Sequence, residues 1–187
     1  MLYCPDSGAT DVPENTAQAI TTYSQIVLAS YQDSLAAAQA MDTTLQAFTA
    51  APSAATLGAA KTAWLTSREP YLQTEVYRFY DGPIDDADGP EGLMNAWPLD
   101  ESYIDYVDGM PTAGIVNGSE ELSATNLEAL NEQGGEENVA TGYHAIEFLL
   151  CGQDMRDTGP GARPDTDIAD MGTAERRVGR RWLELPR

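Results

Sequence analysis

Residues 15–48 read NTAQAITTYSQIVLASYQDSLAAAQAMDTTLQAF, and this stretch decides the fold class. Apolar side chains recur in it at steps of three and four residues, and neither glycine nor proline interrupts them. This spacing is typical of a long amphipathic helix, because one helical turn takes about 3.6 residues. Pro13 precedes the helix, while Pro52 ends it and Ser53 offers the cap of a second helix.

The second helix is expected over residues 54–80, with Pro70 as a kink. Because only a short turn separates them, the two long helices should form an antiparallel hairpin. Farther along the chain, glycine, proline and acidic residues predict irregular loops, which we place at residues 81–98, 109–119 and 153–171. Between the loops we expect shorter helical segments, at residues 100–107, from Ser123 to Gly134–Gly135, from about Glu136 to Cys151 with a stop at Gly152, and at 173–185.

The sequence contains no alternating strand pattern of useful length and no internal repeat. It therefore predicts an all-α protein, with up-and-down helices in a four-helix-bundle-like arrangement and long irregular loops. Residues 1–14 are expected to form an N-terminal linker and residues 15–187 the helical domain.

Composition excludes several classes of function. The 187 residues carry 30 acidic and 10 basic side chains, a formal net charge of −20, which repels the phosphates of nucleic acids. No stretch is apolar for long enough to span a membrane, and the N-terminal MLYCPDSGATD lacks the basic and apolar regions of a secretory signal. The acidic surface is compatible with high solubility or with attraction of metal cations.

The residues with the clearest chemical potential lie in GYHAIEFLLCGQD, residues 142–154. On a helix, His144, Glu147 and Cys151 fall on one stripe, beside an apolar stripe that includes Tyr143 and Leu150. The only imidazole of the chain therefore neighbours a carboxylate at the edge of the apolar face, a place typical of metal ligands and acid–base pairs. The alternative is a structural histidine, hydrogen-bonded to Glu147 or to a backbone carbonyl within a packed bundle.

One histidine and one glutamate make only part of a metal site, so other segments would have to supply further groups. Cys151 is a possible soft ligand, although such a residue is more often a small buried apolar group. The other candidates are mostly acidic side chains from three segments: Glu75 and Arg78, then Asp100, Glu101 and Asp105, and finally Asp154.

Three segments together resemble the imelysin family, also called insulin-cleaving metallopeptidases. They are REPYLQTEVYRFYDGPID (68–85), NAWPLDESYIDYVDG (95–109) and GYHAIEFLLCGQD (142–154), which contains a GxHxxE motif. The resemblance implies a bacterial cell-envelope protein, periplasmic or outer-membrane-associated, and often iron-regulated. It also implies a motif formed here by Gly142, His144 and Glu147, near the contact between two helical halves.

The sequence departs from the family pattern in two places. Cys151 stands where the family commonly has tryptophan, which would loosen the packing beside His144 without removing a ligand. The chain also ends at ERRVGRRWLELPR (175–187), so the resemblance covers only the N-terminal half of the family's length. We therefore expect a truncated domain with exposed apolar surface and possible self-association.

Three functions follow as hypotheses. The first is an envelope protein that binds a divalent or ferric metal ion through His144, Glu147 and the nearby carboxylates Glu75, Asp100 and Glu101, in iron acquisition with other iron-uptake components. Hard carboxylates and one imidazole favour iron, and zinc is possible. The second is a metallopeptidase in which Glu147 is the catalytic general base. The third is a helical interaction module without metal.

Overall fold

The computed structural model describes residues 13–159, 161–165 and 167. Within them it contains helices and no β-strand, which confirms the all-α prediction. The helices are α1 (Thr16–Ala50), α2 (Ala54–Thr74), the 3-10 helix η1 (Glu75–Tyr80), α3 (Glu91–Asn95), α4 (Glu101–Ile104), α5 (Ala124–Leu130) and α6 (Gly142–Cys151). Most of the expected linker, the expected helix at 173–185 and the segment 175–187 lie outside the described residues.

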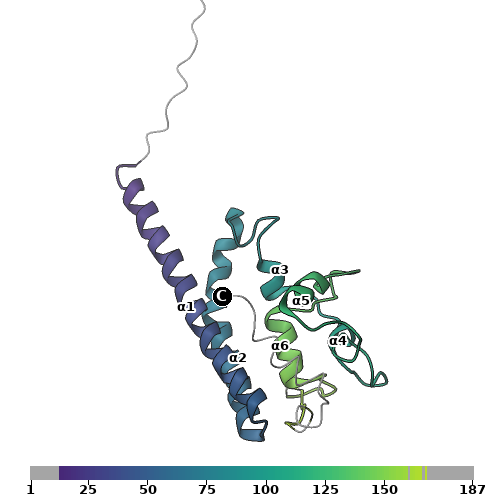
Figure 1. The fold of residues 1–187 in the computed structure, drawn as a ribbon. Helices are drawn as coiled ribbons and strands as arrows, with labels where there is room; N and C mark the ends of the chain where they lie inside the picture. The colour runs from purple at the N-terminus through teal and green to yellow at the C-terminus, as the bar shows by residue number, and fades with distance from the viewer. Residues whose placement is uncertain (1–12, 160, 166, 168–187) are drawn as a thin grey trace, which may run out of the picture.

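The two long helices α1 and α2 form the expected antiparallel hairpin (Figure 1). Its turn is fixed by a capping box at the start of α2. The Ser53 hydroxyl accepts a hydrogen bond from the Thr56 backbone N–H over 3.2 Å, and the Thr56 hydroxyl accepts one from the Ser53 N–H over 3.0 Å. These bonds satisfy amide groups that a helix start leaves without partners, so the local sequence sets where α2 begins.

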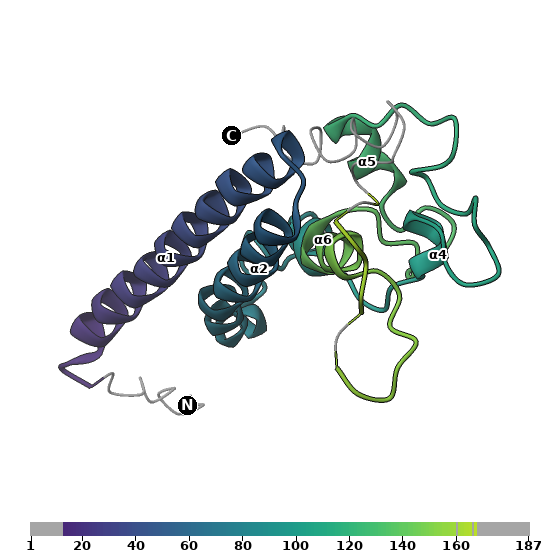
Figure 2. The ribbon, with the colours of Figure 1, turned by 90° about the horizontal axis from the view of Figure 1, so that it is seen from below.

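Helix α2 lies between α1 and α6, η1 continues α2, and α4 and α5 lie beyond α6 (Figures 1 and 2). The core between the hairpin and α6 is apolar, apart from the phenol groups of its two tyrosines. Its buried members are Met41, Leu45, Phe48, Leu57, Ala60, Tyr71, Tyr143 and Leu150. Burying side chains of this size stabilises the packing by about 1.5–3 kcal/mol each, so α6 is firmly attached to the hairpin.

A second core lies on the other side of α6 and joins it to the short helices and loops. Its buried members are Ile104, Val107, Ile115, Val116, Leu122, Leu127, Ala140, Ala145 and Phe148. Helix α6 is therefore buried on two faces, one toward each core. Of the loops that the sequence predicts as irregular, the one at 109–119 contributes Ile115 and Val116 to this second core, which holds it in place.

Several predicted boundaries are wrong. Helix α5 ends at Leu130 and α6 begins at Gly142, whereas the sequence suggested an end at Gly134–Gly135 and a start near Glu136. The cause is tertiary: the Asn131 side-chain oxygen accepts hydrogen bonds from the backbone N–H groups of Ala140 and Thr141, at 2.9 and 3.2 Å, which holds the segment between the helices out of helical geometry.

Two further differences concern the middle of the chain. The expected loop at 81–98 contains the short helix α3. Helix α2 continues through Pro70 to Thr74, and the winding changes to 3-10 geometry only at Glu75.

The expectation of exposed apolar surface is confirmed on the hairpin and η1. Ten large apolar side chains of α1, α2 and η1 are exposed there: Ile20, Tyr23, Ile26, Leu28, Leu35, Leu65, Leu72, Val76, Phe79 and Tyr80. Self-association through this surface stays a prediction. None of the helices in the described part of the chain is both long and apolar enough to cross a membrane.

Candidate functional site

The stripe of α6 between its two buried faces carries His144, Glu147 and Cys151, of which Cys151 also packs against the core toward the hairpin. The adjoining Tyr143 and Leu150 are buried toward the hairpin, and Phe148 is buried toward the second core. The helix ends where predicted, because Gly152 adopts a positive φ of 69° and its N–H donates to the Phe148 carbonyl over 2.7 Å. The helical spacing of the sequence thus presents these three side chains on one face.

This stripe forms one wall of a cleft of about 520 Å³. Residues of the 97–110 segment also line the cleft, as do Gly152, Gln153, Asp154 and Gly161. Four carboxylate residues line the cleft together with the histidine: Asp100, Glu101, Glu147 and Asp154. Its apolar surface comes from Trp97, Leu99, Val107, Met110 and Phe148.

His144 is placed at the edge between buried and open space. Its side chain is 17 % exposed, and its Nδ1 atom lies 3.7 Å from Glu147 Oε2, too far for a hydrogen bond. Nδ1 is buried and has no hydrogen-bond partner among the described residues. The Trp97 ring lies against the imidazole, with ring centroids 4.9 Å apart. A buried nitrogen without a partner is costly, so the arrangement suits a ligand that uses it.

The structure explains why the first position of the GxHxxE motif, Gly142, is a glycine. Gly142 has a φ of +84°, and a Cβ atom at this position would overlap the carbonyl oxygen of Met94 on α3. Only glycine tolerates both conditions. Close contact between α3 and the first turn of α6 thereby fixes the position of His144 two residues later.

Other predicted residues reach the same cleft. Asp100 caps α4, where its Oδ1 accepts hydrogen bonds from the Ser102 N–H at 2.9 Å and the Ser102 hydroxyl at 2.7 Å. Asp154 accepts a hydrogen bond from the Arg156 N–H over 3.0 Å. Cys151 is half-buried, and burial raises the pKa of its thiol, which keeps it protonated and weakens it as a metal ligand.

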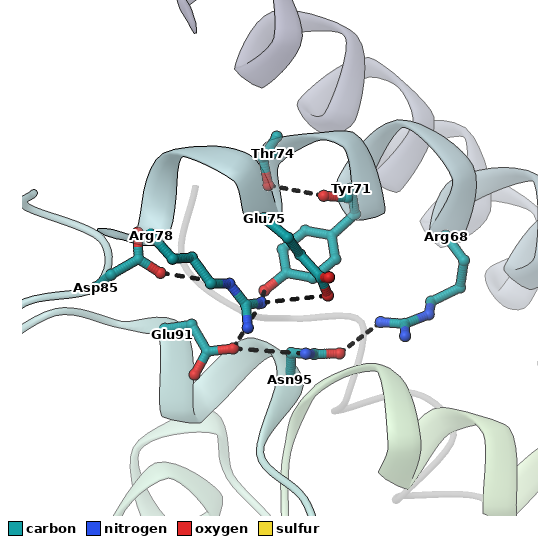
Figure 3. A network of polar contacts seen from close by, with 8 residues as sticks. All are labelled: Arg68, Tyr71, Thr74, Glu75, Arg78, Asp85, Glu91 and Asn95. Atoms are coloured by element: carbon teal, nitrogen blue, oxygen red, sulfur yellow. Dashed lines mark hydrogen bonds and ion pairs between the residues drawn. The ribbon is translucent and has the colours of Figure 1, made fainter. Parts of the chain in front are cut away.

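The structure does not bring Glu75 or Arg78 into the cleft. They belong to a separate polar network between η1 and the 85–95 segment (Figure 3). The Arg78 guanidinium lies 2.8 Å from Glu91, 3.5 Å from Asp85 and 3.8 Å from Glu75. It also donates to the Tyr71 hydroxyl over 2.9 Å, and in the same network Arg68 donates to the Asn95 side chain. This network ties the loop after η1 to α2.

Asp105 has a different role as well. It is fully buried and forms an ion pair of 2.6 Å with Arg163, whose side chain is 2 % exposed. The Asn117 side chain and the Tyr106 N–H also donate to the Asp105 carboxylate. The Arg163 N–H donates to the Cys151 carbonyl over 2.8 Å, so the pair anchors the segment after α6 to α4.

The sequence did not reveal the apolar part of the cleft or the Asp105–Arg163 pair. Trp97 lies in one of the segments that resemble the imelysin family, but nothing in its neighbourhood predicts contact with His144. Arg163 lies in a stretch without periodicity, so its burial had no sequence signal. Both contacts join segments far apart in the chain.

The donor set can be compared with what a metal ion needs. The imidazole and the Glu147 carboxylate suit two positions on one ion, because the unpaired Nδ1 faces that carboxylate. Among the residues that the structure describes, no three histidine, cysteine, aspartate or glutamate side chains stand close enough to hold an ion together. A metal ion held by His144 and Glu147 would therefore need water or another molecule in its remaining coordination positions.

Comparison with known proteins gives two matches. The family model named Imelysin matches residues 27–181. The chain is also similar to a protein of Synechococcus elongatus named "Iron-regulated protein A", with 35 % identity over 126 residues, which are 67 % of this chain and 29 % of that protein. The chain thus spans under a third of its relative's length. Since the family model covers most of the chain, including the cleft and its GxHxxE helix, this protein belongs to the imelysin family.

Proposed function

We propose that this protein binds a metal ion, iron in the first place, through His144 and Glu147 in the cleft, and that it serves iron acquisition in the bacterial cell envelope. The observation that carries the proposal is the buried, unpartnered Nδ1 of His144, which lies 3.7 Å from the Glu147 carboxylate. The similarity to a protein named for its regulation by iron supports the choice of metal. In this function the metal is the cargo.

The charges around the cleft support the same function. Asp100, Glu101 and Asp154 line it beside Glu147, and the whole chain carries a net charge of −20. A cleft with one sign of charge raises the local concentration of cations and speeds their association. Carboxylate and imidazole donors suit iron and manganese, and they also accept zinc.

The proposal is tested by isothermal titration of the purified chain with Mn(II), with Zn(II) and, without oxygen, with Fe(II). The salt concentration must be high enough to screen the acidic surface. We expect one saturable site that His144→Ala abolishes and that Glu147→Gln weakens at least tenfold. The matched control is Glu75→Gln, because the Glu75 side chain is 42 % exposed and that of Glu147 45 %, while only Glu147 lines the cleft.

Each other outcome has a definite meaning. Saturable binding that His144→Ala leaves intact places the metal elsewhere and overturns the proposal. Absence of binding favours the helical interaction module, in which His144→Ala changes only stability. A third outcome is that the wild type cleaves an unfolded peptide, while Glu147→Gln keeps full metal affinity and loses this cleavage. In that case Glu147 is a general base and the protein is a peptidase.

A further inference from the structure

The cleft is larger than a metal ion requires. A hydrated ion with six waters takes up roughly 180 Å³, at about 30 Å³ for each water. The cleft of about 520 Å³ is nearly three times as large and falls in the range typical of sites for small organic molecules. Its size therefore indicates an occupant that is larger than a hydrated metal ion and contains an organic part.

The apolar residues that line the cleft indicate that this organic part is itself apolar. Trp97 and Met110 stand at the cleft and are 67 % and 48 % exposed, unusually high for such large side chains. Leu99, Val107 and Phe148 continue the apolar surface inward. Exposed apolar surface framed by polar groups is typical of a ligand-binding groove, and Trp97 also contacts His144 directly.

The charged residues that line the cleft indicate the charge of the occupant. Four carboxylate residues and one histidine line the cleft, and the described residues that line it include no lysine or arginine. An anionic occupant would meet carboxylates with no compensating cation, whereas a cationic one gains from the same field. The donor pair His144 and Glu147 leaves most positions of an octahedral ion to other donors.

We propose that the cleft binds its metal as a cationic chelate, an ion already held by a tetradentate organic ligand. His144 and Glu147 fill its two open positions, and Trp97 packs on its apolar body. This inference rests on the proposed function, because it assigns the form in which the metal arrives. Trp97 is then the residue that distinguishes the chelate from the bare ion.

The test compares two ferric complexes that differ in charge. One is the cationic complex of a linear dihydroxamate, the other the anionic complex of a dicatecholate of similar length, and both leave two coordination positions to water. Titration should show at least tenfold tighter binding of the hydroxamate complex. Its visible charge-transfer band should shift when protein donors replace the two waters, and His144→Ala should abolish the shift.

Variants separate the aromatic contact from the metal ligands. Trp97→Ala should weaken the hydroxamate complex at least tenfold more than it weakens the binding of bare Mn(II), because Trp97 packs on the chelate as well as on His144. Phe79→Ala is the control, because it also removes an aromatic ring, from a side chain that is 88 % exposed and lies outside the cleft. Equal effects of Trp97→Ala on chelate and bare ion would contradict the inference.

The failures of the two proposals can be told apart. If bare Mn(II) binds in a His144-dependent way and neither ferric complex binds, the chelate is wrong and the proposed function stands. Equal affinity for the two complexes also overturns the inference, because charge then plays no part. If neither the bare ion nor a complex binds, both proposals fail together.

Discussion

The hydroxyl groups of Ser67 and Tyr143 share a hydrogen bond of 2.8 Å, although 76 residues separate them in the sequence. Both residues are buried, and Tyr143 directly precedes His144 on α6. The Trp64 indole on α2 adds a second link, because its N–H donates to the Tyr143 carbonyl over 2.8 Å. Together these bonds fix α6 on the hairpin one residue away from the candidate ligand.

Tyr143→Phe should destabilise the protein by about 1–2 kcal/mol, because it leaves the buried Ser67 hydroxyl without this partner. Urea unfolding followed by circular dichroism measures the loss. The control Tyr80→Phe removes the hydroxyl of an exposed side chain and should change stability by less than about 0.5 kcal/mol. Equal effects of the two substitutions would show that the buried bond contributes nothing.

Two glycine substitutions should change the stability of the protein in opposite directions. Gly142→Ala forces a side chain into a positive φ and against the Met94 carbonyl, so we expect a loss of about 2–4 kcal/mol and weaker metal binding. Gly58→Ala lies in α2 with open space around the new Cβ and should stabilise the protein by about 0.5–1 kcal/mol. Thermal unfolding of both variants checks the pair. A stable Gly142→Ala variant would mean that α3 and α6 can separate easily.

Removing one partner of the buried Asp105–Arg163 ion pair should strongly destabilise the protein. Arg163→Met leaves the Asp105 carboxylate buried without its cation, at a cost of about 3–5 kcal/mol. The double variant Asp105→Leu/Arg163→Met should recover part of this loss, since no uncompensated charge remains. Denaturant unfolding of wild type, single and double variants completes the cycle. A single-variant loss below about 1 kcal/mol would contradict the role of the pair as an anchor.

The protein should lose stability in alkaline solution between pH 10 and 12. Burial raises the pKa of Tyr71 from 10.0 to about 12, against the opposing effect of Arg78. For Tyr106, burial and then the hydrogen bond to Asp167 raise the pKa to about 12. Because the unfolded chain releases these protons first, their stabilising contribution is complete below pH 10 and is lost as the pH approaches 12.

The measurement is the free energy of unfolding as a function of pH, beside the ultraviolet absorbance of phenolate. Tyr71→Phe should flatten the alkaline decline, by on the order of 2 kcal/mol for this 5 % exposed side chain. Tyr80→Phe should leave the decline unchanged. An identical decline in wild type and in Tyr71→Phe would exclude Tyr71 as its cause.

The helical class, the hairpin and the stripe of α6 can be predicted from the amino-acid sequence alone. Apolar spacing in residues 15–48, the cap at Ser53 and the stop at Gly152 are local signals, and each acts through a few neighbouring backbone groups. The placement of His144 and Glu147 on one face follows from helical geometry alone. These features depend on neighbours in the chain, so they can be predicted without the fold.

Which residues meet around that stripe depends on the fold. The side chain of Asn131 binds the backbone just before Gly142, nine and ten residues along the chain, whereas Trp97 packs on His144 and Arg163 pairs with Asp105 through contacts between distant segments. Glu75 and Asp100 have the same chemistry in the sequence, yet one joins the Arg78 network and the other the cleft. An acidic residue in the sequence does not reveal which group its carboxylate will contact. That contact depends on which segments the fold brings together.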